Sequence, residues 1–279
     1  MIIKAEKFYS LSDLWKNIKK LPQKRKYICG GTDIAVSLKY GSLDIDCLID
    51  ISDVKELSLI KKEKNNIFIG AGVKISEFEN SEIIKKYVPS LYESLKYYAS
   101  PTIRNIATLG GNLANASPCA DGVLALLASR AKVILNLYGK KRVLEIKDVF
   151  VGPKKTSIKK DELIEGFLVP IWSHKSVFLK SIPRKIFGIS KAGLCVCADI
   201  KNRAVMDISV AASSVGPVVL RCSKTETFLK GKEINDKTVE DSYKIIKTEV
   251  SPINDHRSVA EYRKEIIGVF LKRALLTLK

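Results

Sequence analysis

One stretch, residues 102–121, constrains this chain more than any other part of its sequence. It reads TIRNIATLGGNLANASPCAD and joins two adjacent glycines to a series of hydrogen-bonding side chains. Apolar residues nevertheless run through its whole length, which is unusual for a surface loop. Glycines let a backbone approach a ligand without a Cβ in the way, and free N–H groups in such turns attract anions. The stretch therefore predicts a buried wall of a ligand site.

The composition is that of a soluble globular protein. The 279 residues are 46% hydrophobic and 28% charged, enough for one large core or two ordinary domains. No run of about 18 apolar residues is present, so we expect no membrane span. The N-terminus lacks a long apolar segment before a small-residue cleavage site, which predicts a cytoplasmic protein.

The net charge of +18 raises the question of nucleic-acid binding. Lysine greatly outnumbers arginine and is scattered along the chain, whereas arginine is the residue suited to bidentate phosphate recognition. No helix-turn-helix, zinc-finger or aromatic RNA-binding signature accompanies the charge. The sequence favours a solvated lysine-rich surface, or one facing an acidic partner subunit, and we expect no nucleic-acid partner.

The cysteines and histidines do not predict a metal site. The six cysteines form no Cys-x-x-Cys pair, and the two histidines, His174 and His256, lie far apart. Cys195 and Cys197 alternate in an apolar run and would share one face of a strand. We expect buried free thiols in a reducing compartment, and no catalytic residue or metal ligand in this chain.

Strands and helices are mixed along the chain, which indicates an α+β architecture. A capping-box spacing places a helix start at Ser76 with Glu79, and residues 140–160 are expected to be connecting material. A domain boundary is expected near residues 170–176. We predict strands over 4–9, 26–29, 46–51, 67–73, 132–137, 162–170, 176–180, 193–201 and 207–213, and helices from Ser12 and over 34–39, 91–99, 120–129, 238–250 and 258–278.

A second glycine turn, Gly30-Gly31-Thr32-Asp33, follows the strand at 26–29. It lacks the G-x-G-x-x-G spacing of the Rossmann fingerprint, and taken alone a purely structural turn explains it at least as well. Two such turns, each after an apolar run, would suit a cleft in which backbone amides from both sides hold a pyrophosphate.

Several motifs together resemble a known family. The central run I-R-N-x-A-T-x-G-G-N-x-x-x-A-S-P-x-x-D is matched at every fixed position by residues 103–121. Further matches are a G-G-T-D-hydrophobic turn within Cys29 to Ile34, a D-E-L-I…P strand at 161–170, an F-x-K strand at 178–180 followed by Arg184, and a D-x-R…Y-R tail at 255–263. The chain resembles the FAD-binding medium subunit of the molybdenum hydroxylases, the family of xanthine dehydrogenase and aerobic carbon monoxide dehydrogenase.

The resemblance implies the fold and its domains. Residues 1–172 would form a two-subdomain FAD-binding fold of the vanillyl-alcohol oxidase (PCMH) type. Residues 173–279 would form a smaller α+β C-terminal domain of the CO dehydrogenase flavoprotein type.

The resemblance also implies which residues contact FAD. Residues 29–34 would hold the pyrophosphate and the adjoining ribityl chain, mainly through backbone N–H groups. Residues 108–112 would line the opposite side of the cofactor, where the Thr108 hydroxyl would reach a phosphate. Asp121 would accept hydrogen bonds from ribose or ribityl hydroxyls, Tyr98 would stack on a flavin ring system, and Lys180 would bring positive charge near the isoalloxazine. The full set is Cys29, Gly30, Gly31, Thr32, Asp33, Ile34, Tyr98, Thr108, Leu109, Gly110, Gly111, Asn112, Asp121, Ile164 and Lys180.

Structural roles compete with several of these assignments. Tyr98, beside Tyr97, and Ile164 are also ordinary core residues. Asp121 also suits the start of the following helix, which is compatible with binding a hydroxyl. The assignment of Lys180 depends on its alignment with the F-x-K strand.

By resemblance, the protein is an electron-transfer subunit. FAD would take electrons from the [2Fe–2S] clusters of a small subunit, and substrate would be hydroxylated at a molybdopterin-binding large subunit. NAD, oxygen or another molecule would accept the electrons, in a cytoplasmic heterotrimer. The alternatives are a non-catalytic assembly or nucleotide-binding scaffold with the same fold, and an independent flavin oxidase.

Overall fold

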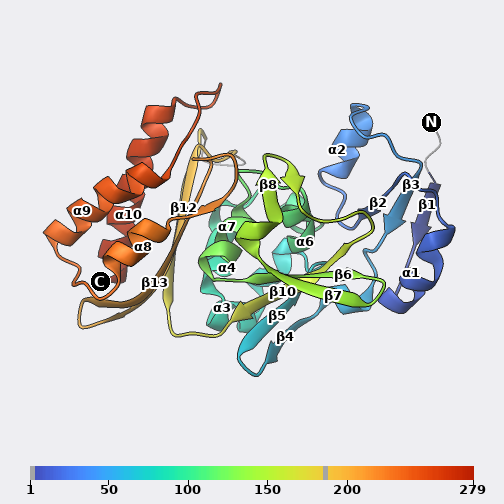
Figure 1. The fold of residues 1–279 in the computed structure, drawn as a ribbon, viewed down its shortest axis with the longest axis horizontal. Helices are drawn as coiled ribbons and strands as arrows, with labels where there is room; N and C mark the ends of the chain where they lie inside the picture. The colour runs from blue at the N-terminus through green and yellow to red at the C-terminus, as the bar shows by residue number, and fades with distance from the viewer. Residues whose placement is uncertain (1–3, 185–187) are drawn as a thin grey trace.

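The computed structural model describes residues 4–184 and 188–279 and arranges them in three units along its long axis (Figure 1). An N-terminal unit lies at one end, a central unit in the middle, and a C-terminal unit at the other end. The three sheets of these units are separate in their hydrogen bonding. The units therefore meet through side chains and loops, and a ligand site between them needs residues from distant parts of the sequence.

The N-terminal unit is a small parallel sheet with its own core. Strands β1 (Lys4–Lys7), β2 (Arg25–Ile28) and β3 (Cys47–Asp50) pair in the order β1-β3-β2. Parallel neighbours need crossover connections, and these contain helices α1 (Leu11–Asn17) and α2 (Ile34–Lys39). Ser10, two residues before the predicted start at Ser12, caps α1 by accepting a hydrogen bond from the Asp13 N–H.

The central unit is an antiparallel sheet covered by helices. Its strands pair in the order β4-β5-β10-β6-β7. Helix α7 is buried along its entire length, which explains why its sequence, DGVLALLA, is almost wholly apolar. The elements are β4 (Ile60–Glu63), β5 (Asn66–Gly70), β6 (Lys132–Leu137), β7 (Lys140–Glu145), β8 (Phe150–Gly152), β9 (Lys155–Thr156), β10 (Leu163–Pro170), α3 (Glu82–Tyr87), α4 (Pro89–Ser94), α5 (Pro101–Arg104), α6 (Leu109–Ala114) and α7 (Asp121–Ala128).

Short 3₁₀ helices complete both units. They are η1 (Ile18–Lys20), η2 (Lys55–Ser58), η3 (Ile75–Glu79), η4 (Leu95–Tyr97) and η5 (Ile146–Val149).

The C-terminal unit is a second antiparallel sheet with both faces covered. Strands β11 (Lys175–Ser181), β12 (Ala192–Lys201), β13 (Ala204–Ser213) and β14 (Leu220–Arg221) pair in that order. Helices α8 (Ser223–Leu229), α9 (Asp236–Glu249) and α10 (Ala260–Leu278) cover the outer face (Figure 1). Leu194 and Val196 belong to the core on that face, whereas Cys195 and Cys197 belong to the core of the central unit. The prediction that the two cysteines share one strand face is confirmed.

Two local predictions were wrong, and the helix predicted over 91–99 was confirmed in part. The helix start at Ser76 is a 3₁₀ turn, η3, whose box is formed instead by Lys74 and Glu77: the Glu77 carboxylate accepts from the Lys74 N–H. Residues 140–160, expected to be connecting material, contain the edge strand β7 and the β8–β9 pair. The predicted helix over 91–99 is α4 followed by η4. Helix α8 was not predicted at all.

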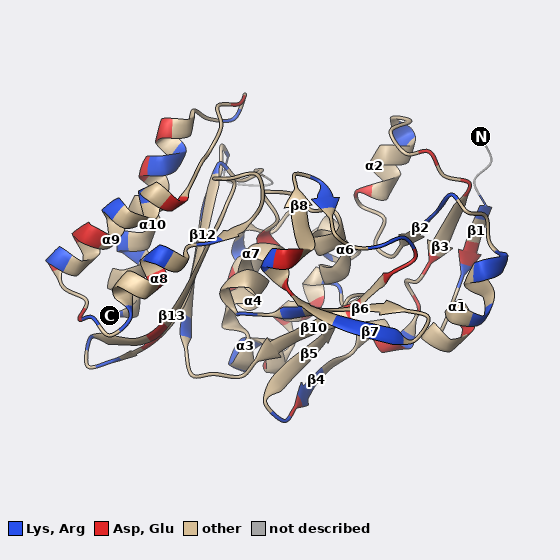
Figure 2. Cartoon of the chain, viewed as in Figure 1, with Lys and Arg blue, Asp and Glu red and all other residues tan. Residues whose placement is uncertain are grey.

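Other sequence expectations concern absences. No helix within residues 4–184 and 188–279 is long and apolar enough to cross a membrane. All six cysteines carry free thiols. Among the described residues, no group of three or more His, Cys, Asp or Glu side chains is arranged to hold a metal ion. Lysine and arginine are spread over all three units and interleave with acidic residues (Figure 2).

A buried ion pair fastens the N-terminal unit to the central unit. The Arg25 guanidinium donates to both carboxylate oxygens of Asp161, at 2.9 and 2.7 Å, and the Tyr27 hydroxyl donates to the Asp161 carbonyl. The side chains of Arg25 and Asp161 are only 3% and 14% exposed. Such planar, two-point contacts are the strongest class of protein ion pair, so this one fixes the relative position of the two units.

We expect Arg25→Met to destabilise the chain by about 2 kcal/mol, because it leaves the mostly buried Asp161 carboxylate without its partner. Thermal unfolding followed by circular dichroism measures the change. Lys24→Met is the matched control, since Lys24 pairs with Asp44 on the exposed surface and should contribute far less. Equal effects of the two substitutions would contradict the assigned role of Arg25.

Candidate cofactor-binding site

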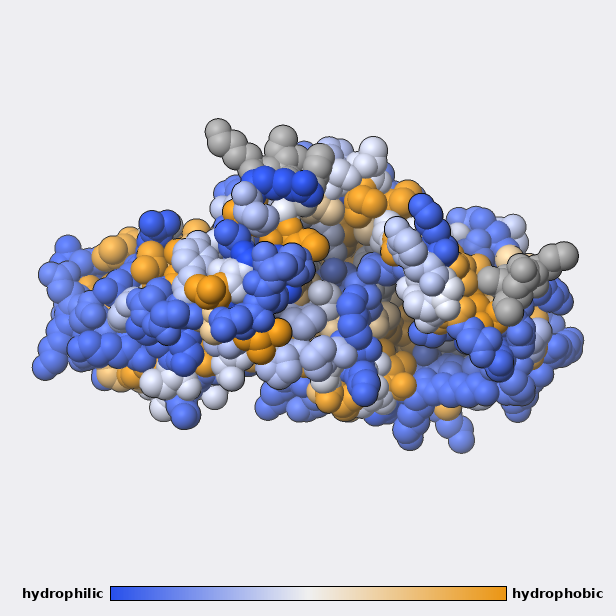
Figure 3. Space-filling view, turned by 90° about the horizontal axis from the view of Figure 1, so that it is seen from above, coloured by the Kyte–Doolittle hydropathy of each residue, from blue (hydrophilic) through white to orange (hydrophobic). Residues whose placement is uncertain are grey.

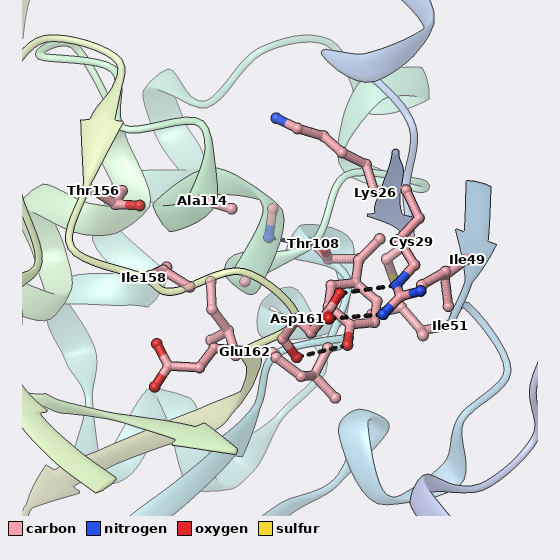
Figure 4. Close-up of a pocket in the computed structure, with 18 of the residues that line it drawn as sticks. Lys26, Cys29, Ile49, Ile51, Thr108, Ala114, Thr156, Ile158, Asp161 and Glu162 are labelled. Carbon is pink, nitrogen blue, oxygen red and sulfur yellow. Dashed lines mark hydrogen bonds and ion pairs between the residues drawn. The ribbon is translucent and has the colours of Figure 1, made fainter. Parts of the chain in front are cut away.

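A cavity of about 400 Å³ lies between the N-terminal and central units. Tyr27 on β2, Ile49 on β3 and Ile51 just after β3 form one wall, and the segment 156–164 forms another (Figure 4). The start of α6 closes the third side. Seen from above, hydrophobic residues border the hollow between these units (Figure 3). The cavity has the size and mixed apolar and polar lining of a small-molecule or cofactor site.

Two of the predicted glycines are required by close backbone contacts. A Cβ on Gly30 would lie 2.0 Å from the Ile106 carbonyl oxygen, and one on Gly110 would lie 2.6 Å from the Ala71 Cβ. The segment before α6 therefore packs directly against the turn after β2 on one side and the turn after β5 on the other. Both glycines are needed for the fold, whatever else they contact.

The turn after β2 presents unused hydrogen-bond donors. Within the part of the chain that the structure describes, the N–H groups of Gly30, Gly31, Thr32 and Asp33 donate to no protein acceptor. Gly31 has a φ of +71°, a left-handed conformation that favours glycine. Successive free N–H groups in such a turn form a concave anion-binding surface.

The other glycine turn is different, because most of its N–H groups are already used. The N–H groups of Leu109 and Gly110 donate to the carbonyls of Val73 and Ala71. Thr108 caps α6, its hydroxyl oxygen accepting from the Gly111 N–H at 3.2 Å, which leaves the hydroxyl hydrogen free to donate. This wall therefore offers the Thr108 hydroxyl and the bare surface of Gly111.

Cys29 and Ile164 complete the set of predicted residues that line the cavity, together with Thr108, Gly110 and Gly111. Burial raises the pKa of the Cys29 thiol to about 11, and the nearby Thr108 hydroxyl opposes that rise. Cys29 is therefore a neutral thiol at physiological pH, and Ile164 is a buried apolar wall residue.

Asp33 and Ile34 end the glycine turn and begin α2, and neither is among the residues that line the cavity. Asp33 accepts a 2.6 Å hydrogen bond from the Asn115 side chain, and the Lys154 ammonium donates to the same Asn115 at 2.6 Å. This chain of contacts joins the glycine turn of the N-terminal unit to α6 and to the loop before β9. Ile34 is the first residue of α2 and is half-buried.

Ten of the predicted residues are not among those that line the cavity: Gly30, Gly31, Thr32, Asp33, Ile34, Tyr98, Leu109, Asn112, Asp121 and Lys180. Leu109 and Tyr98 belong to the core of the central unit. Burial raises the pKa of the Tyr98 hydroxyl, as does the nearby Asp121 carboxylate. The Asn112 side chain caps α7 by accepting a hydrogen bond from the Val123 N–H at 3.1 Å. These residues have structural roles in the central unit, and the sequence alone did not distinguish such roles from contact with a ligand.

Asp121 and Lys180, the remaining two, contact each other. The Lys180 ammonium lies 2.7 Å from Asp121 Oδ2 and donates to the Tyr97 carbonyl at 3.2 Å. Burial raises the pKa of Asp121, whereas the Lys180 charge opposes that rise. The second carboxylate oxygen, Oδ1, is buried and has no protein partner. An unsatisfied buried oxygen of this kind calls for a partner from a ligand or from water.

Sequence reasoning missed the basic and acidic residues of the cavity. Arg25 and Asp161 close one end of the cavity, and Glu162 is held by both Nε and Nη2 of Arg142 at 2.7 Å. Arg25 begins β2 one residue before the predicted strand, and it shares a strand face with Tyr27. No local signal, however, identifies a partner 136 positions away. Lys26, Lys159 and Lys160 also line the cavity and give it positive charge.

Comparisons with known proteins agree with this geometry. The protein-family model described as the FAD binding domain in molybdopterin dehydrogenase matches residues 3–172. The family model of the CO dehydrogenase flavoprotein C-terminal domain matches residues 178–278. The nicotinate dehydrogenase FAD-subunit of Eubacterium barkeri is 31% identical over 252 residues, which cover 88% of this chain and 85% of the relative. The glyceraldehyde dehydrogenase medium chain of Sulfolobus acidocaldarius is 28% identical over 247 residues, 88% of each chain.

A solved structure shares the whole fold. A chain of the carbon monoxide dehydrogenase from Hydrogenophaga pseudoflava, in a form that lacks the Mo-pyranopterin moiety, has a TM-score of 0.93 and 25% sequence identity. The match covers 100% of this chain and 98% of that chain.

The fold and the cavity define a flavoprotein of the two-domain, α+β type. This chain belongs to the family of FAD-binding medium subunits of the molybdenum hydroxylases. It is an FAD-dependent oxidoreductase subunit, and the resemblance read from its motifs is confirmed, as is the predicted fold class. The free N–H groups at Gly30–Asp33, the basic lining and the unpartnered Asp121 oxygen fit a cofactor with a pyrophosphate and several hydroxyl groups.

Gly111 provides a clean test of the cavity wall. It is exposed, and an added Cβ would meet only the Thr108 hydroxyl oxygen, at 3.1 Å. We expect Gly111→Ala to fold normally but to bind FAD at least about tenfold more weakly, because the methyl group would occupy space at the phosphate. Fluorescence titration of the apoprotein measures the affinity. Gly110→Ala is the contrasting variant, since its Cβ would collide with Ala71 and should lower the unfolding temperature. A folded Gly111→Ala variant with unchanged FAD affinity would remove Gly111 from the site.

Proposed function

We propose that this chain relays electrons and does not itself transform the substrate. Bound FAD would receive electrons from the [2Fe–2S] clusters of a small partner subunit and pass them to NAD or another acceptor. Flavin supplies the required chemistry because it accepts electrons singly or in pairs and releases a pair as hydride. The protein contributes binding, orientation and electrostatic surroundings.

The observation that carries this proposal is the pairing of the carboxylates in the cavity. Among the described residues that line it, Asp161 is held by Arg25, and Glu162 by Arg142. The Arg142 guanidinium lowers the pKa of Glu162. No histidine lines the described cavity. A described lining whose carboxylates are both held by arginines, and which contains no histidine, suits electron relay better than substrate turnover.

Different residues of the site would bind different parts of the cofactor. The N–H groups of Gly30–Asp33 and the Thr108 hydroxyl would hold the pyrophosphate, and Gly111 would allow its close approach. Tyr27, Ile49 and Ile164 would pack against the apolar parts at the Arg25 end. Asp121 Oδ1 would accept from a hydroxyl group of the ribityl chain. The stacking role of Tyr98 stays a prediction.

The partners complete the proposal. The named relatives are medium chains and FAD subunits, which supports a complex with a [2Fe–2S] small subunit and a molybdopterin-binding large subunit. We propose a cytoplasmic location, which the six free thiols favour. A domain boundary near residue 172 is supported by the end of β10 at Pro170 and the start of β11 at Lys175.

The relay model predicts the behaviour of the isolated chain. It should bind one FAD, but purine or aldehyde substrates added under anaerobic conditions should not bleach the flavin, because this chain would have no substrate site. A chemically reduced [2Fe–2S] partner subunit should bleach it. Absorbance at the flavin maximum measures both reactions.

Three outcomes would count against the model. Rapid bleaching by substrate alone would mean that the chain has its own substrate site. Failure of the reduced partner to bleach bound FAD would contradict the relay. A purified wild-type chain that neither carries nor takes up FAD would favour the scaffold alternative.

A further inference from the structure

Two of the six free thiols, Cys29 and Cys119, are half-buried, and the other four are buried. A cysteine reacts readily when its sulfur is accessible and when its surroundings favour negative charge on the sulfur. Exposure therefore leaves two candidates for thiol chemistry. Cys29 is the poorer of them, because burial raises the pKa of its thiol to about 11.

Cys119 lies in the loop between α6 and α7, where an arginine contacts its sulfur. The Arg257 guanidinium donates from Nη1 to Cys119 Sγ at 3.3 Å, and the thiol donates to the Ser190 carbonyl oxygen at 3.8 Å. Arg257 belongs to the segment between α9 and α10 in the C-terminal unit. The central motif leaves position 119 open, so the family resemblance implies no role for this thiol.

A cluster of charged side chains fixes the Arg257 guanidinium. Its Nε and Nη2 donate to Asp255 Oδ2, and Asp255 Oδ1 accepts from Arg263, whose side chain is 3% exposed. Although burial opposes it, the two arginines hold the pKa of Asp255 below its ordinary value, so this carboxylate is ionised. Two guanidinium groups and one carboxylate leave one net positive charge. At contact distance, that charge stabilises the negative charge that develops on the sulfur as it reacts.

Buried polar groups beside this cluster lack protein partners. Ser190, whose carbonyl contacts the thiol, is 1% exposed, and Ser214, whose N–H donates to the Pro118 carbonyl at 2.8 Å, is 3% exposed. Neither hydroxyl has a hydrogen-bond partner, and Arg263 Nε is also buried without one. Buried donors of this kind call for a partner, so the surroundings of Cys119 suit an added polar or anionic group.

We propose that Cys119 is a modification site at which hydrogen peroxide oxidises the thiol to a sulfenic acid. The sulfur attacks one peroxide oxygen, so that an S–O bond forms and the O–O bond breaks. Sulfur gives up two electrons, and the departing hydroxide takes up the thiol proton and leaves as water. Arg257 stabilises the negative charge on the sulfur during the attack. Thiol reductants reverse sulfenic acid formation, so the modification is a reversible one.

The main competitor is Cys197 on β12. The neighbouring Cys195 thiol and the His174 imidazole lower the pKa of Cys197. Cys197 is nevertheless fully buried, at 0% exposure. Peroxide reaches its sulfur only after the C-terminal sheet separates from the central unit, so we expect Cys119 to react first.

The test measures the oxidation rate of each cysteine in the purified full chain. Hydrogen peroxide is added with dimedone, which traps sulfenic acids, and peptide mass spectrometry quantifies the labelled cysteines. We expect Cys119 to be labelled at least about tenfold faster than the others, and Arg257→Met to slow it by about tenfold, the effect of losing a charge-assisted hydrogen bond. Arg257→Lys keeps the positive charge and should retain most of the rate. Arg273→Met is the matched control, since Arg273 is exposed on α10 and its loss should leave the rate unchanged.

Faster labelling of Cys29 or Cys197 than of Cys119 in the wild type would overturn the proposal, and this comparison does not require any variant to fold. Equal labelling rates in the wild type and in a folded Arg257→Met variant would also overturn it, because the arginine would then have no part in the reaction.

Discussion

The arrangement of this protein depends on the close packing of one segment, residues 106–111, between two turns. Gly30 brings the turn after β2 against the backbone at Ile106, and Gly110 brings the same segment against Ala71 after β5. Backbone hydrogen bonds between residues 71–75 and 107–110 reinforce the second contact. A side chain at Gly30 would push the N-terminal unit away from the central unit, and one at Gly110 would disturb the packing of α6 inside the central unit, so the shape of the cavity depends on the absence of a Cβ at both positions.

The two glycine turns differ in what their N–H groups bind. At the second turn, the N–H groups of Leu109 and Gly110 donate to the Val73 and Ala71 carbonyls, so this turn has a mainly structural role. The turn at Gly30–Asp33 keeps its donors free among the described residues, which makes it the better anion-binding surface. Ion pairs also join the units: Arg25 on β2 with Asp161 at the cavity, and Lys180 on β11 with Asp121 at the start of α7. Arg25 and Asp161 both line the cavity and join two units, so a substitution there should affect the site and the packing of the units together.

Much of this could be predicted from the sequence. Residues 103–121 identified the family and one wall of the cavity, because the motif is local and continuous. The apolar strands β10, β12 and β13 were found, since strands buried on both faces read as apolar runs. Strand β7 was missed because its sequence, KKRVLE, is largely charged and it lies at the edge of its sheet. The Arg25–Asp161 and Lys180–Asp121 contacts were also missed, since ion pairs between distant residues leave no periodic signal. Sequence alone could not separate Asn112, which caps α7, from residues that face the cavity.

The central claim is that the cofactor site lies between the N-terminal and central units, and amide hydrogen exchange tests it most directly. The isolated chain is compared with and without saturating FAD, and protection is followed in the segments 29–34, 108–112 and 156–164, with α10 in the C-terminal unit as the reference. The structure predicts that FAD slows exchange in all three segments. Unchanged exchange in 29–34 and 108–112 when FAD is bound would contradict a site between these two units.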